Sequence, residues 1–255
     1  AARKGQAMNL LTRIFWRLMP STERQMLLSQ TPHYQRRHLE RILKGRAHYQ
    51  ACFDQHAALF IHIPKSAGRS VVRGLFDVQS VEHAPADWYQ QLDREKFDRY
   101  FKFTFVRNPW DRAVSAYTYL RKGGSKASKD DQYWCQFVNT FGSFDEFVCN
   151  WMSEENIMRN ALFTPQVAYL KNIFGQVNMD FIGRFENLEE DFKTIASKLN
   201  LEAQLPHLNQ SRAEEYQSLY TESSREVIRK IYAEDINTFA YEFNDTVRDR
   251  EHEKT

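Results

Sequence analysis

The residues that could do chemistry first appear at residues 64–70, where a lysine and small polar residues follow an apolar run. Residues 58–63 are short, branched and apolar, which predicts a buried strand, and the turn P-K-S-A-G-R-S comes directly after it. A strand, a small-residue turn and a helix in this order favour the binding of phosphate, because free N–H groups at a helix N-terminus attract anions. Lys65 adds a positive charge, and Gly68 would let the backbone approach an anion closely.

The same arrangement recurs about forty residues further along the chain. Residues 101–106 are a second strand candidate, and Asn108 and Pro109 suit the cap and the first turn of a following helix. Arg107 therefore lies at the end of a strand, and Ser115 lies on the helix, roughly 9 Å along its axis. Two such anion sites predict a ligand with phosphate groups at both ends.

The first turn is not the common nucleoside triphosphate loop. The chain has no Gly-Lys-Ser/Thr, and Arg107 follows the second strand where a metal-binding aspartate could stand. The charge of a nucleotide bound without magnesium must be met by arginine, lysine and backbone amides, and a guanidinium suits a phosphate well. We therefore expect no metal site.

At this point the motifs I-P-K-S-A-G-R-S and F-x-F-V-R-N-P-W-D-R-x-V-S-A-Y resemble the two cofactor motifs of sulfotransferases. The chain is most similar to the carbohydrate branch, with the heparan sulfate 2-O- and chondroitin-type enzymes and their bacterial relatives. The resemblance covers roughly residues 57 to 243, including F-I-G-R-F-E-N-L at 181–188 and L-N-Q-S at 208–211. It implies that 3′-phosphoadenosine 5′-phosphosulfate (PAPS) is the sulfuryl donor and 3′-phosphoadenosine 5′-phosphate the product.

The resemblance also implies a set of donor-binding residues. Around the 5′-phosphosulfate it places Lys65, Ser66, Ala67, Gly68, Arg69 and Ser70. It assigns the 3′-phosphate to Arg107 and Ser115, and the adenosine side to Asn209 and Ser211. The alternative for Arg107 and Ser115 is an ordinary ion pair and a serine on a helix face.

Sulfuryl transfer to a hydroxyl needs a base for the proton and a cation at the leaving phosphate. Lys65 is our candidate for the cation. His83, between the two motifs, is our candidate base, since its ordinary pKa lies near neutrality and similar enzymes use a histidine at about this place. Glu82 is the alternative, as the base or as the group that orients His83. His83 as a surface turn residue remains open, and we interpret His62 as mostly structural.

The acceptor is expected to be a carbohydrate, because of the branch that the chain resembles. Gln166 lies in a segment similar to one that faces the acceptor sugar, so we expect Gln166 and His83 to contact it; a solvated amide is the alternative for Gln166. The polar and aromatic residues 123–141 are interpreted as a lid over the acceptor.

Alternating strands and helices predict an α/β fold with a P-loop-like parallel sheet flanked by helices. We divide the chain into a basic helical N-terminal extension, residues 1–50, and a catalytic domain, residues 51–255. The remaining expected elements are strands near 78–81 and 179–185, helices at 69–77, 109–122 and 188–200, one or two helices over 8–50, and one long helix with an aromatic turn over 221–243.

A net charge of +2 argues against a general nucleic-acid binder. Residues 1–50, however, carry ten Lys and Arg against two Glu, so this segment either packs on the catalytic domain or lies on an anionic membrane surface. Three cysteines with no metal spacing favour a reducing compartment. With Met8 as the start we expect a bacterial, cytoplasmic protein, and the Golgi lumen if the chain belongs to a longer one.

The leading interpretation is a metal-independent, PAPS-dependent sulfotransferase acting on a sugar hydroxyl. One alternative is a small-molecule kinase on the same scaffold, which should require magnesium. A second is a catalytically silent glycan-binding protein, which should bind the nucleotide without turnover.

Overall fold

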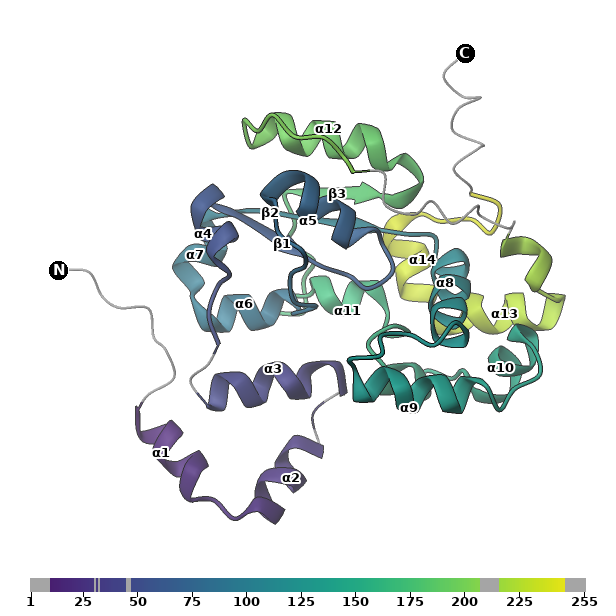
Figure 1. Ribbon diagram of the computed structural model, residues 1–255, viewed down its shortest axis with the longest axis horizontal. Helices are drawn as coiled ribbons and strands as arrows, with labels where there is room; N and C mark the ends of the chain where they lie inside the picture. Colours follow the sequence, from purple (N-terminus) through teal and green to yellow (C-terminus); the bar gives the residue numbers. More distant parts are fainter. Residues whose placement is uncertain (1–9, 30, 32, 45–46, 207–215, 246–255) are drawn as a thin grey trace.

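The protein folds around a parallel three-stranded sheet, as expected for the α/β class (Figure 1). The computed structural model describes residues 10–29, 31, 33–44, 47–206 and 216–245. The strands are β1 (Ala58–Ile61), β2 (Phe101–Val106) and β3 (Phe181–Arg184), in the order β1-β2-β3. Both pairings are parallel, so the carboxyl ends of all three strands point the same way.

The helices fall into three groups. The N-terminal group is α1 (Leu10–Leu18), α2 (Ser21–Ser29) and α3 (His33–Leu43). The helices around the sheet are α4 (Ala51–His56), α5 (Gly68–Phe76), α6 (Ala86–Leu92), α7 (Arg94–Arg99), α11 (Gln166–Leu170) and α12 (Leu188–Lys198). The second group of the catalytic domain is α8 (Pro109–Arg121), α9 (Lys129–Val138), α10 (Phe144–Trp151), α13 (Glu222–Ile231) and α14 (Ala233–Phe239). Short 3₁₀ turns occur at Asn156–Arg159, Phe185–Asn187 and Tyr216–Leu219.

The strands form where the sequence concentrates aromatic and branched residues. Every residue of β1 is buried, and Phe60 of β1 stacks on Phe103 of β2 with ring centroids 5.1 Å apart. Strand β3 is at the edge and more exposed. Its Gly183 is required by packing, because a Cβ there would lie 2.6 Å from the Phe105 ring. The Phe105 ring of β2 thus packs directly against the β3 backbone.

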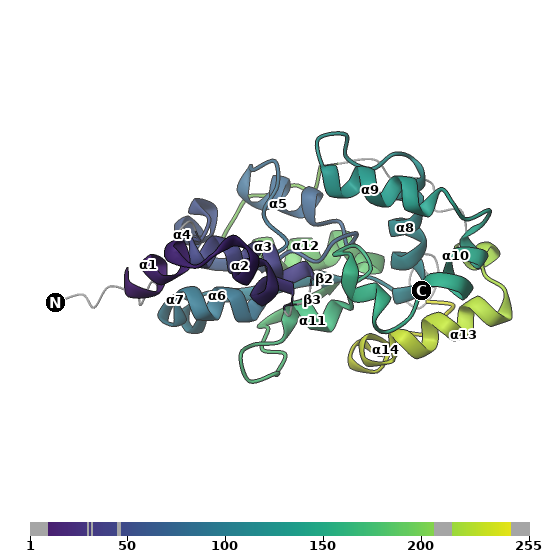
Figure 2. The same ribbon diagram turned by 90° about the horizontal axis from the view of Figure 1, so that it is seen from below.

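Two hydrophobic cores stabilise the described part of the chain from Tyr49 onward, one around the sheet and one among α8, α9, α10 and α13. Figure 1 and Figure 2 show the second group of helices at one end of the molecule, with α4, α6 and α7 at the other. The carboxyl ends of β1 and β2 lead into α5 and α8, so the two motifs meet where the two cores adjoin.

Three expectations about elements were wrong. Residues 77–85, all of them described, form neither helix nor strand, because the Val81 carbonyl accepts a hydrogen bond from the His62 ring instead of a strand partner. The segment after Thr221 is two helices, α13 and α14, which separate at Tyr232. Residues 8–50 contain three helices rather than one or two.

Helix α3 joins the N-terminal helices to the catalytic domain. The Gln35 side chain donates to the Asp87 carboxylate of α6 at 3.2 Å, and Figure 1 shows α3 between α1 and α2 on one side and the sheet on the other. Within the described part of the chain, no helix has the length and apolar character needed to cross a bilayer.

Candidate active site

The first motif forms a tight turn between β1 and α5. Lys65 and Ala67 both adopt left-handed backbone conformations, with φ of 71° and 60°. Such conformations cost a non-glycine residue roughly 1 kcal/mol each and concentrate at ligand-binding sites. Helix α5 begins at Gly68, and no described side chain caps its N-terminus. The positive end of α5 is therefore available to an anion.

Ser66 lies in the middle of this turn and is buried. Its hydroxyl has no hydrogen-bond partner among the described residues. A buried, unpaired hydroxyl is costly unless a ligand or water completes it. Gly68, beside it, is required by packing as well, since a Cβ there would lie 2.0 Å from the His62 ring.

Lys65 adds a positive charge to this turn. Its ammonium lies over the Tyr119 ring, 4.4 Å from the centroid, and the Tyr119 hydroxyl donates to Asp131 at 2.6 Å. Burial and the neighbouring Arg107 lower the pKa of Lys65 to about 8, against a smaller raising effect of Asp131. Lys65 is therefore a desolvated cation, which an anionic ligand would stabilise.

His83 is held by a backbone hydrogen bond. Its Nδ1 lies 2.9 Å from the His62 carbonyl oxygen, and only a protonated Nδ1 can donate to a carbonyl. The neutral ring therefore has its basic lone pair on Nε2. The rings of His62 and His83 are 4.0 Å apart at their centroids. Burial and the charge of His83 lower the pKa of His62 well below its usual value, so His62 is a neutral packing residue.

Glu82 and the His83 backbone both contact helix α3. The Glu82 carboxylate forms an ion pair with Arg41. The Nε2 atom of His38 lies 3.1 Å from the His83 carbonyl oxygen. Helix α3 thereby fixes the backbone that carries the candidate base, a role that sequence reasoning did not assign to it.

The polar groups of the second motif already have partners within the protein. Arg107 donates from Nε and Nη2 to the two oxygens of Asp111, each at 2.8 Å, and from Nη1 to the Lys65 carbonyl at 3.1 Å. Its guanidinium also lies over the Phe185 ring, 4.0 Å from the centroid. Helix α8 is capped by its own Asn108, which accepts from the Trp110 N–H. Arg107 is thus oriented before any ligand binds.

Gln166 is fully buried, and its side-chain amide forms hydrogen bonds with the backbone of Arg107. Its Oε1 accepts from the Arg107 N–H and its Nε2 donates to the Arg107 carbonyl, both at 2.9 Å. The buried Asp235 in turn accepts from the N–H groups of Gln166 and Val167. In this conformation Gln166 acts on the site through Arg107, not through a surface that a sugar could reach.

Arg112 is a buried residue of the second motif whose importance sequence reasoning missed. It donates to the backbone carbonyls of Pro64, Leu162 and Thr164. The signal available in the sequence was its place five residues after Arg107 within N-P-W-D-R. Arg112 joins the first motif to the second, so the two loops form one unit.

With this geometry described, comparison with known proteins identifies the chain. A sequence model of the sulfotransferase family matches residues 50–242. The chain belongs to the sulfotransferase family. An uncharacterized protein of Archaeoglobus fulgidus is 35% identical over 117 residues, which cover 45% of this chain and 80% of that protein. No solved structure matches.

The family assignment makes this sulfotransferase a transferase, and sulfuryl transfer is its general reaction. Ser115 lies one helical turn beyond Asp111 on α8, on the face that begins with Arg107. Arg69 is exposed and Ser70 half-buried in the first turn of α5. Asn209 and Ser211 lie outside the described residues. Among the residues that are described, no cluster of side chains could hold a metal ion.

The expected lid of this sulfotransferase is largely part of its core. Trp134, Cys135 and Val138 of α9 are buried in the second hydrophobic core. The loop before α9 is tied down as well, because Asp131 accepts from the Ser125 N–H at 2.8 Å as well as from Tyr119. The lid expectation for 123–141 was therefore wrong for α9, although Asp131 of α9 lies near enough to Lys65 to raise its pKa.

Proposed function

We propose that the protein transfers the sulfuryl group of PAPS to a hydroxyl of a carbohydrate acceptor. Membership of the sulfotransferase family supports the reaction class. The turn that carries Lys65 and the carbonyl-held ring of His83 support the division of labour between a cation and a base.

The single observation that carries the proposal is the unpaired Ser66 hydroxyl at the uncapped end of α5. No described side chain completes either group, and the Lys65 ammonium belongs to the same turn. A phosphosulfate offers acceptor oxygens for all of these donors at once, with charge of the right sign. The residues from Lys65 to Ser70 therefore fit the 5′ end of the donor.

Each remaining residue has a role that follows from its environment. Nε2 of His83 accepts the proton of the acceptor hydroxyl, while the His62 carbonyl keeps the ring oriented. The Lys65 ammonium offsets negative charge at the phosphate side of the bond that breaks. Arg107, with Ser115 on the same helix face, binds the 3′-phosphate. When bound, the donor supplies the sulfuryl group.

The first experiment compares 3′-phosphoadenosine 5′-phosphate with ADP as stabilising ligands, both in the presence of a chelator. A specific ligand at about a hundred times its dissociation constant adds about 2.7 kcal/mol to the free energy of unfolding. We expect the 3′-phosphorylated nucleotide alone to raise the melting temperature of the wild-type protein. Stabilisation by both nucleotides, or by neither, would remove the basis of the proposal.

Arg107→Ala tests the 3′-phosphate assignment, and Arg225→Ala is the matched control. Arg225 also pairs with a carboxylate, that of Glu222, but on the exposed face of α13. We expect Arg107→Ala to weaken binding by roughly 2 kcal/mol, as for loss of a charge-assisted contact. Each shift is measured from the variant's own unliganded melting temperature. Equal affinity in both variants would refute the assignment.

His83→Ala tests the base. Loss of a general base should lower turnover by on the order of a hundredfold, with unchanged affinity for the nucleotide. Sulfate transfer from labelled PAPS to a panel of neutral oligosaccharides, acidic oligosaccharides and non-sugar alcohols measures both the turnover and the acceptor class. Full turnover in the variant would exclude His83 as the base, and transfer only to non-sugar hydroxyls would overturn the carbohydrate acceptor.

A further inference from the structure

Helices α1 and α2 leave apolar side chains on the outside of the molecule. Ile14, Phe15 and Leu18 of α1 are exposed, Phe15 to 65% and Leu18 to 78%. Met26 and Leu27 of α2 are exposed as well. These five residues, which we call the N-terminal apolar surface, are half of all the large hydrophobic residues exposed in the described part of the chain.

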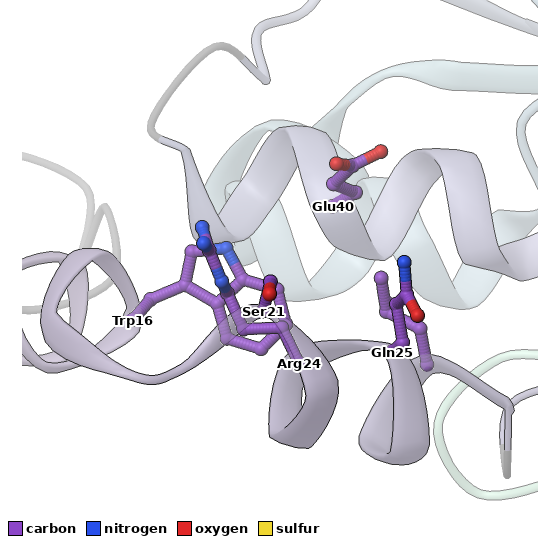
Figure 3. Close-up of a pocket in the computed structure, with 6 residues that line it drawn as sticks. Trp16, Ser21, Arg24, Gln25 and Glu40 are labelled. Carbon is purple, nitrogen blue, oxygen red and sulfur yellow. The ribbon is translucent and has the colours of Figure 1, made fainter.

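The two helices are oriented by what they bury. Trp16 is buried and lines a pocket of about 170 Å³ with Ser21, Arg24 and Leu28 of α2 and Glu40 of α3. Figure 3 shows the Trp16 indole beside Ser21 and Arg24. Because Trp16 turns inward, Ile14 and Leu18, each two residues away from it, lie on the opposite side of α1.

Helices α1 and α2 lie on the outer side of α3 (Figure 1). Figure 1 shows α1 and α2 beyond α3, on its side away from the sheet, and Figure 2 shows the same helices in front when the molecule is seen from below. Packing of α1 and α2 on the catalytic domain, one of the two alternatives for this segment, therefore does not cover these side chains.

Charge indicates what covers them. Residues 1–50 carry ten basic and two acidic residues, whereas residues 51–255 carry twenty-five basic and thirty-one acidic ones. Arg17 is exposed beside the apolar residues of α1. A symmetric dimer through this surface would bring the like positive charge of a second N-terminal segment against it, whereas an anionic lipid surface would be attracted to it and would accept the apolar side chains.

We infer that α1 and α2 bind the surface of an anionic phospholipid bilayer, with the N-terminal apolar surface inserted at the level of the headgroups. Such a segment lies on the membrane rather than spanning it. Binding places the membrane on the α3 side of the protein, and α3 is the helix that contacts Glu82 and the His83 backbone. The inference is independent of the proposed donor and acceptor.

The test is sedimentation of the full chain with vesicles of phosphatidylcholine alone or with added phosphatidylglycerol. We expect binding to the anionic vesicles, at least tenfold weaker binding to the neutral ones, and partial release at high salt. Phe15→Glu should lower the binding at least tenfold. The matched control is Phe174→Glu, because Phe174 is equally exposed, at 64%, in the catalytic domain; this variant should bind like the wild type.

Charge and self-association are tested separately. Arg17→Gln should weaken binding to the anionic vesicles severalfold. Lys230→Gln, which changes an equally exposed basic residue of α13, should not weaken it. Equal binding of the two phenylalanine variants, or no difference between the two vesicle types, would overturn the inference. Light scattering without lipid supplies the last outcome: a dimer that Phe15→Glu converts to a monomer would assign this surface to a second copy of the chain instead.

Discussion

Helices α5 and α8 both begin where a parallel strand ends, yet their first turns are satisfied in different ways. Asn108 caps α8, whereas no described side chain caps α5. Arg107 at the start of α8 is held on both sides of its guanidinium by Asp111 and Lys65. At α5, the Ser66 hydroxyl lacks a described partner and the pKa of Lys65 is lowered. The second loop is held in place by the protein's own groups, whereas the first loop leaves groups that a ligand would complete.

This difference separates residues that serve ligand binding from residues that serve stability, and a motif alone does not distinguish the two kinds. Truncation of the Lys65 or Ser66 side chain should reduce binding or turnover without lowering the free energy of unfolding, because the Ser66 hydroxyl lacks a described partner and the Lys65 ammonium is desolvated. Substitutions around Arg107 should lower stability, because buried partners would lose their hydrogen bonds.

The largest expected effect comes from Lys65→Ala. Removing a cation that offsets developing charge should lower turnover by on the order of a hundredfold or more. Circular dichroism melts should show a melting temperature equal to that of the wild type or above it, since a desolvated ammonium is removed. A large loss of stability would contradict the comparison, because it would make Lys65 part of the framework.

Gln166→Glu tests the second loop with almost no change in shape. One carboxylate oxygen can still accept from the Arg107 N–H, but the other would face the Arg107 carbonyl, to which Nε2 now donates. We expect the free energy of unfolding to fall by about 1–3 kcal/mol, the cost of a buried group left unpaired, measured by urea denaturation. An altered KM for the acceptor with unchanged stability would instead support the sequence-based expectation that Gln166 contacts sugar.

The two loops and the two strands before them were predictable because their signals are local. Apolar runs followed by small residues locate the turn at 64–70, and Asn108 with Pro109 locates the start of α8. For Arg107 an ordinary ion pair was the alternative that we left open, and Asp111 in the first turn of α8 is its partner.

What could not be predicted depends on contacts between distant segments. Gln166 is 59 residues from the Arg107 backbone that it completes, and nothing in its own neighbourhood specifies that partner. The expected strand at 78–81 failed for the same reason, because the Val81 carbonyl is used by the His62 ring. Helix α9 resembled a lid because its sequence is polar and aromatic, but Trp134 is buried in the second core and Phe137 packs against it.

The pH dependence of binding should sharpen the comparison. The pKa of Lys65 is about 8 in the free protein, and an anion beside the ammonium raises it. Affinity for 3′-phosphoadenosine 5′-phosphate should therefore be full below about pH 8 and fall above it by up to roughly tenfold per pH unit. Calorimetric titration between pH 7 and 9 measures this. Lys65→Arg should bind with little change over that range, because a guanidinium remains protonated.

The lowered pKa of Lys65 also predicts how the stability of the protein without ligand changes with pH. The pKa of Lys65 is lowered on folding from 10.5 to about 8, so the unfolded chain binds more protons between these values. This residue's contribution to stability should therefore rise as the pH increases through that interval. Wild-type stability that rises with pH more steeply than that of Lys65→Arg would agree, and parallel profiles would show that Lys65 is not desolvated.

Ser66→Ala has the smallest expected effect, and it tests directly whether a ligand completes the first loop. The Ser66 hydroxyl is buried without a described partner, so its removal should leave the free protein as stable or slightly more stable. If the phosphosulfate end of the donor uses this hydroxyl, nucleotide affinity should fall by about fivefold, the value of one net hydrogen bond. Ser224→Ala is the control, because Ser224 is equally buried but belongs to the capping box of α13. It should lower the free energy of unfolding by about 1 kcal/mol and leave affinity unchanged. Two serines of equal burial would then respond in opposite ways, because one is completed by the protein and the other by its ligand.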